Sequence, residues 1–133
     1  MSAEGWKAGL TCHKFTWDVA SSQGGAVGTI ALGDLPDNFV VTHCVAVAET
    51  ALTGGGSVVV GEDGGGDADG YFTDLDAIAV ATPVKGSGAL VNNTGAEIMH
   101  KVAAAKDGVL LTIATTAYTA GKIHFFFIGV QAD

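Results

Sequence analysis

The chain has 133 residues, which is enough for one domain, and its 48% apolar content argues against overall disorder. Fourteen acidic side chains outnumber six lysines, arginine is absent, and the formal net charge is −8. This charge would repel a phosphate backbone and therefore argues against nucleic-acid binding. The sequence has no apolar stretch of the ~18 residues that a membrane helix needs, and no secretory signal pattern at its start, so we expect no membrane partner and synthesis in the cytoplasm.

The first nine residues differ from the rest of the chain. Residues 1–9 are polar and predict an N-terminal arm, whereas residues 10–133 predict the folded domain. Trp6 is the exception in this arm. An indole in such a position usually anchors the arm to its own domain or to a neighbouring subunit.

Short β-type apolar runs separated by turn residues follow the arm. The longest of them is almost continuously apolar between residues 40 and 48, on both faces of an extended strand. Such a strand lies inside a protein or faces a partner. The runs of this first half predict strands at residues 10–19, 26–32, 39–52 and 57–61.

The second half of the chain is less regular. Residues 62–70 predict a Gly-Asp loop, and residues 96–106 fit either a helix, favoured by several alanines, or a strand and a loop. Residues 119–121 predict a turn. The remaining β-type runs lie at residues 71–81, 89–91, 108–117 and 122–131.

This spacing gives about eight or nine short strands with turns between them, and no alternation of strands with helices. We therefore predict an all-β, single-domain antiparallel β-sandwich of jelly-roll type. Two cysteines, Cys12 and Cys44, lie within β-type runs without a metal-binding spacing, and we expect both thiols to be reduced.

Several residue groups could carry chemistry, but each also has a structural interpretation. The carboxylates of residues 62–70 could wrap a calcium ion, although the loop fits no EF-hand template and also suits a solvated hairpin. Asp74 and Asp76 share a strand face, as paired hydrolytic carboxylates would, but also suit the surface. Four histidines show no metal spacing: His13, His43, His100 and His124. The sequence thus predicts a non-enzymatic protein without metal or cofactor.

The strongest positive signal is the amount of apolar side chain in the runs at residues 39–52 and 122–131. One sandwich face cannot hide all of it, so either loops or a subunit interface cover the surplus. We predict a homo-oligomer, most simply a trimer. The residues expected at its interfaces are Trp6, Val45, Val47, Phe125 and Phe127.

Several strings, in their order along the chain, resemble small virion proteins of tailed bacteriophages, of the capsid decoration (cement) or head-fibre kind. The resemblance spans roughly residues 10–131. Between residues 91 and 108 the chain departs from the family's pattern, because this stretch is short and rich in alanine. The strings are FTWD at 15–18, GTIAL at 28–32, LPDN at 35–38, ETALT at 49–53, SVVVG at 57–61, LTIA at 111–114 and TAGKI at 119–123.

The resemblance implies a trimeric β-sandwich on the exterior of the virion, made in the host cytoplasm and bound to the major capsid protein. It implies no catalysis and no cofactor. The alternative function is a phage fibre or tail module that binds a host glycan. That function needs an exposed aromatic cluster, for which the candidates are Tyr71, Phe72 and Tyr118.

Overall fold

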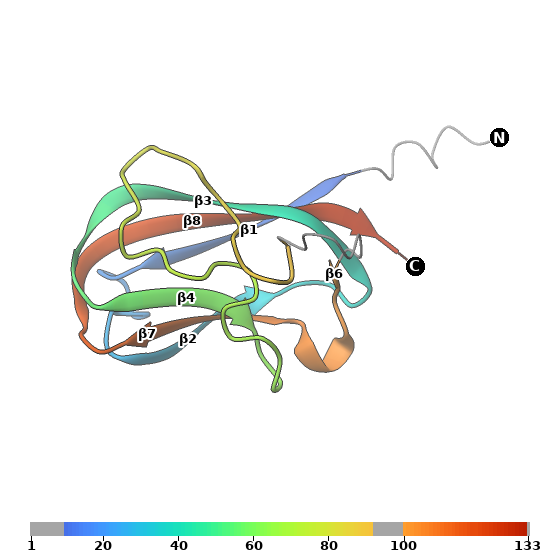
Figure 1. The fold of residues 1–133 in the computed structure, drawn as a ribbon, viewed down its shortest axis with the longest axis horizontal. Coiled ribbons are helices and arrows are strands. Elements are labelled where there is room, and N and C mark those ends of the chain that lie inside the picture. The colour runs from blue at the N-terminus through green and yellow to red at the C-terminus, as the bar shows by residue number, and fades with distance from the viewer. Residues whose placement is uncertain (1–9, 92–99, 133) are drawn as a thin grey trace.

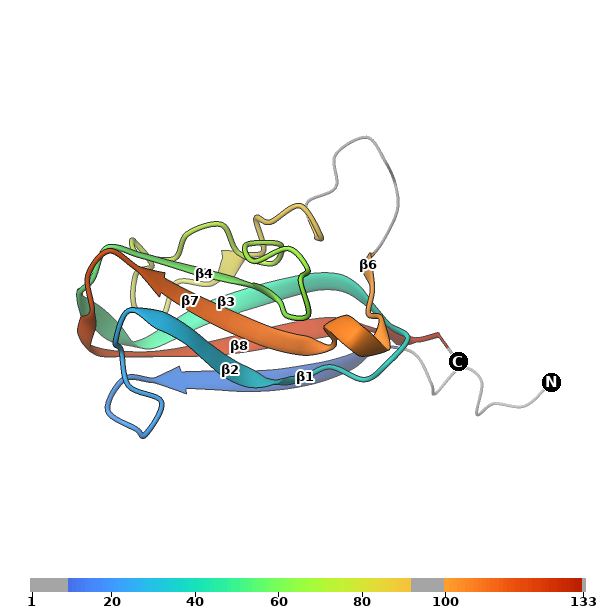
Figure 2. The same ribbon diagram turned by 90° about the horizontal axis from the view of Figure 1, so that it is seen from below.

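The computed structural model describes residues 10–91 and 100–132, which form a sandwich of two β-sheets (Figures 1 and 2). In the larger sheet, the order is β1 (Thr11–Asp18), β8 (Tyr118–Gln131) and β3 (Phe39–Gly54), followed by the short strands β5 (Val84–Lys85) and β6 (His100–Lys101), which both pair with β3. In the smaller sheet, the order is β2 (Gly28–Asp34), β7 (Gly108–Ala114) and β4 (Ser57–Glu62).

The pairing confirms the predicted all-β sandwich of jelly-roll type. Strands β1 and β8 pair antiparallel, as do β2 with β7 and β3 with β6, so the two halves of the chain fold against each other as one ribbon wound into two sheets. An antiparallel bridge between Val60 and Phe72 continues this order beside β4. The segment at residues 71–91 runs along the β3 and β4 edges and closes that side of the sandwich.

The core lies between the sheets and follows the two-residue alternation of the strands. Every second residue is buried in β3 from Cys44 to Ala48 and in β8 from Gly121 to Gly129, and Trp17 of β1 joins them. The closing segment adds side chains of its own. The largest fully buried side chains are Trp17, Tyr71, Phe39, Phe72, Phe125, Phe127, Leu35, Leu111, Ile113 and Ile123.

Some predicted boundaries were wrong. No strand forms at residues 89–91; β5 forms at Val84–Lys85 instead, where it pairs with Val45 and Ala46 of β3. Residues 71–81 contribute only isolated bridges. The expected turn at 119–121 lies inside β8, because this stretch continues to pair with the end of β3. Local turn composition is outweighed there by long-range pairing.

The ambiguous stretch at residues 96–106 is resolved in part. Residues 100–101 form β6, and a single 3-10 turn follows at Ala104–Lys106. Residues 96–99 lie outside the described residues, as does the predicted arm at 1–9.

Both cysteines are free thiols, as expected. Cys12 is exposed, whereas Cys44 is fully buried in the core, and its burial raises the pKa of the Cys44 thiol to about 12. The unfolded chain would ionise this thiol near pH ~8.5. The folded state therefore holds the proton of Cys44 more tightly than the unfolded chain does. The stability that this difference contributes is present in full below that pH and is lost as the pH rises toward the folded pKa.

We predict that the free energy of unfolding falls above pH ~8.5, with Cys44 contributing up to ~1.4 kcal/mol per pH unit. Cys44→Ala should flatten this slope, even if the variant is less stable at neutral pH. Cys12→Ala, which removes a thiol exposed in both states, is the matched control. Urea unfolding at a series of pH values measures the slope; equal slopes for the wild type and Cys44→Ala would contradict the prediction.

Candidate functional site

The larger sheet has one side that faces away from the core, and we call the side chains on that side the outer face. Strand register aligns these side chains in rows across β1, β8 and β3. The rows are Val130 with Val40; Cys12, Ile128 and His43; Lys14, Phe126 and Val45; Thr16, His124 and Val47; and Asp18 with Lys122.

The rows nearest the end of β8 are mostly apolar. Phe126, Ile128 and Val130 alternate with the buried residues of β8, and each remains partly exposed. Val45 and Val47 lie beside them on β3 and are also partly exposed. None of these five side chains packs against the core cluster. Their apolar surface is therefore surplus to the folding of the described chain.

The outer face does not share the acidity of the chain, which carries −8 as a whole. Lys14 and Lys122 contribute two positive charges, and Asp18 and Glu49 contribute two negative ones. The Lys14 ammonium lies 5.7 Å from the centroid of the Phe126 ring, within the range of a cation–π contact. Lys85 of β5 and Lys101 of β6 pair with Val45 and Val40 and therefore also lie on this face. The outer face is thus a largely apolar, non-acidic area on an acidic protein.

A polar chain of contacts crosses the opposite end of the outer face. The His124 Nδ1 lies 2.9 Å from the Thr16 hydroxyl, and its Nε2 lies 3.0 Å from a Glu49 carboxylate oxygen. The Lys122 ammonium is 3.3 Å from the other carboxylate oxygen. The hydrogen bond from His124 and the contact with Lys122 lower the pKa of Glu49. These contacts tie β1, β8 and β3 together.

Of the five predicted interface residues, Val45 and Val47 lie on the outer face. The assignment of Phe125 and Phe127 to an interface needs correction, because both side chains are fully buried in the core. The alternation of β8 places Phe126 and Ile128 outward in their stead. The sequence could not distinguish these two from Phe125 and Phe127, because residues 125–128 are all apolar whichever of them point toward the core. Trp6 lies outside the described residues.

The Gly-Asp loop at residues 62–70 is folded tightly against the chain. The Asp63 backbone N–H donates to the Gly108 carbonyl, and the Asp63 carboxylate accepts from the Gly108 N–H at 3.1 Å. Gly64 has φ +67°, and a methyl group on it would collide with the Ala105 carbonyl. The Asp63 carboxylate and this glycine therefore attach the loop to residues 105–108.

Within residues 10–91 and 100–132, no three His, Cys, Asp or Glu side chains converge as metal ligands. The four histidines have separate neighbours. His13 packs edge-on against Phe39, and His43 lies 3.0 Å from the Thr42 hydroxyl. His100 Nε2 lies 2.9 Å from the carboxylate of Glu62, whose side chain is only 5% exposed. His100 thereby satisfies a buried acid.

The paired carboxylates Asp74 and Asp76 have structural partners. Asp74 accepts hydrogen bonds from the Val58 and Asp76 backbone N–H groups at 3.3 and 3.0 Å. Asp76 accepts one from the Tyr118 hydroxyl at 2.6 Å. Burial, and then this bond to Asp76, raise the pKa of Tyr118. The pair anchors the closing segment to β4 and β8.

The aromatic cluster that glycan binding requires is not at the surface. Tyr71, Phe72 and Tyr118 are between 0 and 3% exposed. Tyr71 packs against Phe127, Phe72 against Phe125, and Tyr118 against Trp17, each in an edge-on arrangement. Their rings therefore serve the core.

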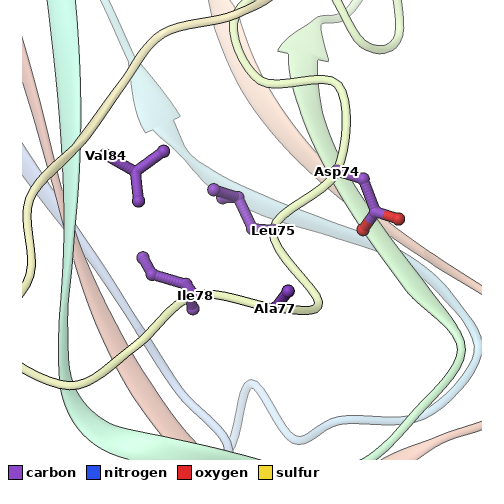
Figure 3. Close-up of a pocket in the computed structure, with 5 residues that line it drawn as sticks. All are labelled: Asp74, Leu75, Ala77, Ile78 and Val84. Atoms are coloured by element: carbon purple, nitrogen blue, oxygen red, sulfur yellow. The ribbon is translucent and has the colours of Figure 1, made fainter.

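A shallow apolar pocket of about 210 Å³ lies on the closing segment (Figure 3). Figure 3 shows the side chains of Leu75, Ile78 and Val84 gathered around a common space. This volume is below the ~300–1,000 Å³ of usual ligand pockets. The lining residues are Asp74, Leu75, Ala77, Ile78 and Val84.

Two solved structures of bacteriophage capsids contain chains with this fold. A chain of the cyanophage Pam1 capsid asymmetric unit has a TM-score of 0.66 and 13% sequence identity, over 92% of this chain and 85% of that one. A chain of the Ralstonia phage GP4 capsid has a TM-score of 0.63 and 19% identity, over 93% and 85%. The fold is that of phage capsid chains.

This likeness agrees with the resemblance to phage virion proteins. No family model and no curated protein matches the sequence. Among the described residues, no helix has the length and apolar character to cross a membrane.

We predict that Gly64→Ala destabilises the protein far more than Gly65→Ala. Both glycines have positive φ, which costs an alanine ~1–2 kcal/mol. Only at Gly64 would the methyl group also collide with the backbone of Ala105, for about 1–3 kcal/mol more. Chemical denaturation measures both variants, and equal losses would show that the loop is not packed as described.

We also predict that His100→Ala lowers the free energy of unfolding by about 1–3 kcal/mol, because the buried Glu62 carboxylate loses its partner. His124→Ala should cost less, since its partner Glu49 is 54% exposed and can be hydrated. The same denaturation experiment compares the two. A larger loss for His124→Ala would contradict the assigned role of the Glu62–His100 contact.

Proposed function

We propose that this chain is a bacteriophage structural protein that decorates and stabilises the exterior of the capsid. The observation that carries the proposal is the outer face, a largely apolar, non-acidic area that the chain's own core does not need. The fold, which is also found in chains of two phage capsids, supports the same role. Its partners are the major capsid protein and further copies of itself, most simply in a trimer, and its place is the virion, after synthesis in the host cytoplasm.

Decoration by many copies suits this molecule physically. Each copy needs only a modest interface, because the repeated lattice of a shell makes the contacts multivalent. A sheet whose strands are joined by cross-strand contacts, such as Thr16–His124–Glu49, loses little conformational freedom when it docks. The work of such a protein is mechanical and requires no catalytic group. We therefore propose a non-enzymatic role.

The outer face supplies the first of the proposed contacts, through Val45 and Val47 on β3 and Phe126 on β8. Trp6 and the arm at residues 1–9 remain the second proposed contact. Glycan binding, the alternative function, has no observation in its favour, because its three candidate aromatic residues are buried.

Co-sedimentation with purified capsids that lack this protein tests the proposal. The wild type should sediment with the shells in a fixed stoichiometry and have the mass of a trimer in solution. Val45→Lys should reduce binding or trimer formation about tenfold or more, since the new ammonium would be buried without a partner. Val27→Lys is the matched control, because Val27 is 55% exposed and precedes β2 in the other sheet.

Two outcomes would contradict the proposal. If the wild type does not sediment with capsids, the decoration role is wrong. If Val45→Lys binds and associates as well as Val27→Lys does, the outer face is not the contact surface.

A further inference from the structure

Strand β1 has an open edge. It pairs only with β8 among the described residues, and the pairing runs through all eight residues without a register shift. Other sheet edges are protected: β3 is covered by β5 and β6, β4 by the bridge to Phe72, and β2 contains a bulge between Ala31 and Gly33. Figure 2 shows β1 at the border of its sheet.

The side chain of Gln23 reveals which backbone groups of β1 point outward. The Asp18 backbone N–H donates to the Gln23 side-chain oxygen at 2.9 Å, and the Gln23 amide donates to the Thr16 carbonyl at 2.9 Å. The carboxamide therefore occupies the place of one residue of a neighbouring strand. It covers the edge only at the end of β1.

The rest of the edge remains uncovered. Because backbone direction alternates with a period of two, Cys12 and Lys14 also present their N–H and C=O groups away from β8, and Thr16 presents its N–H. No hydrogen bond within the described part of the chain pairs with these groups. Regular, unpaired backbone of this kind is a template for an added strand.

The flanks of this edge would also contribute. On the core side, His13 and Phe15 are only half buried, and the Phe15 ring packs against Phe127. An added strand would cover their exposed surface with its own apolar side chains. On the outer face it would lie beside Lys14, which favours a neutral or acidic residue opposite.

We propose that the β1 edge at residues 12–16 accepts an extended segment of the shell protein as an additional strand. This inference rests on the proposed function, and it names the mode of attachment. A second copy of this chain is a poorer occupant, because a symmetric antiparallel pairing of two β1 edges centred on residues 12–16 would place the two Lys14 side chains directly opposite each other. The bound segment has apolar residues toward His13 and Phe15 and no cation opposite Lys14.

Lys14→Pro tests the edge directly. Proline removes an N–H that points away from β8, so the β1–β8 pairing is retained, as for prolines on natural edge strands. Lys14→Ala also removes the ammonium but keeps the N–H, so the difference between the two variants isolates the N–H. In co-sedimentation with capsids, Lys14→Pro should bind about tenfold more weakly than Lys14→Ala.

A second measurement uses only the wild type, so it does not depend on whether a variant folds. Hydrogen exchange of the wild type should show the Lys14 and Thr16 amides unprotected in the free protein and protected on the capsid. Three outcomes would overturn the edge proposal while leaving the decoration role intact. Lys14→Pro could fold and bind capsids like the wild type, both variants could lose the same capsid affinity, or the exchange of the two amides could be unchanged on the capsid. A wild type that does not bind capsids would overturn both.

Discussion

The pairing of β3 with β8 is the interaction on which the rest of the structure depends. These are the two longest strands, of 16 and 14 residues, and they pair from Phe39–Gln131 to Gly54–Tyr118. Both are apolar at almost every central position. Because neighbouring side chains of a strand point to opposite faces, burying one half in the core necessarily turns the other half outward. The apolar outer face is therefore a direct consequence of the register that builds the core.

The fold class could be predicted from the sequence, because strand-length apolar runs separated by Gly, Asp and Asn turns are local signals. The sequence could not predict which of residues 125–128 point toward the core, because all four are apolar, three phenylalanines and an isoleucine. That choice depends on the pairing of Trp17 with Ile123, which is set by contacts between the two ends of the chain. Likewise, Val84–Lys85 becomes a strand only because β3 offers it an edge.

In the candidate site, the positions of Val45 and Val47 could be predicted from the sequence, but the contacts of the acidic and aromatic side chains could not. Asp76 meets Tyr118 across 42 positions, and Glu62 meets His100 across 38. Such pairs leave no spacing pattern in a single sequence. In the structure, Asp63, Asp76 and Tyr118, which belong to groups that suggested calcium binding, hydrolysis or glycan recognition, make contacts that hold the closing segment and the Gly-Asp loop in place. The outer face and the edge of β1 are the surfaces that we propose for partners.

The central claim is that neighbouring protein molecules cover the outer face on an assembled particle. Electron cryo-microscopy of capsids decorated with this protein tests it most directly, because a map with resolved side chains shows what lies against Phe126 and Val45. The account predicts density of a neighbouring subunit packed over these two residues. A decorated particle on which the outer face of β1, β8 and β3 borders only solvent would contradict it.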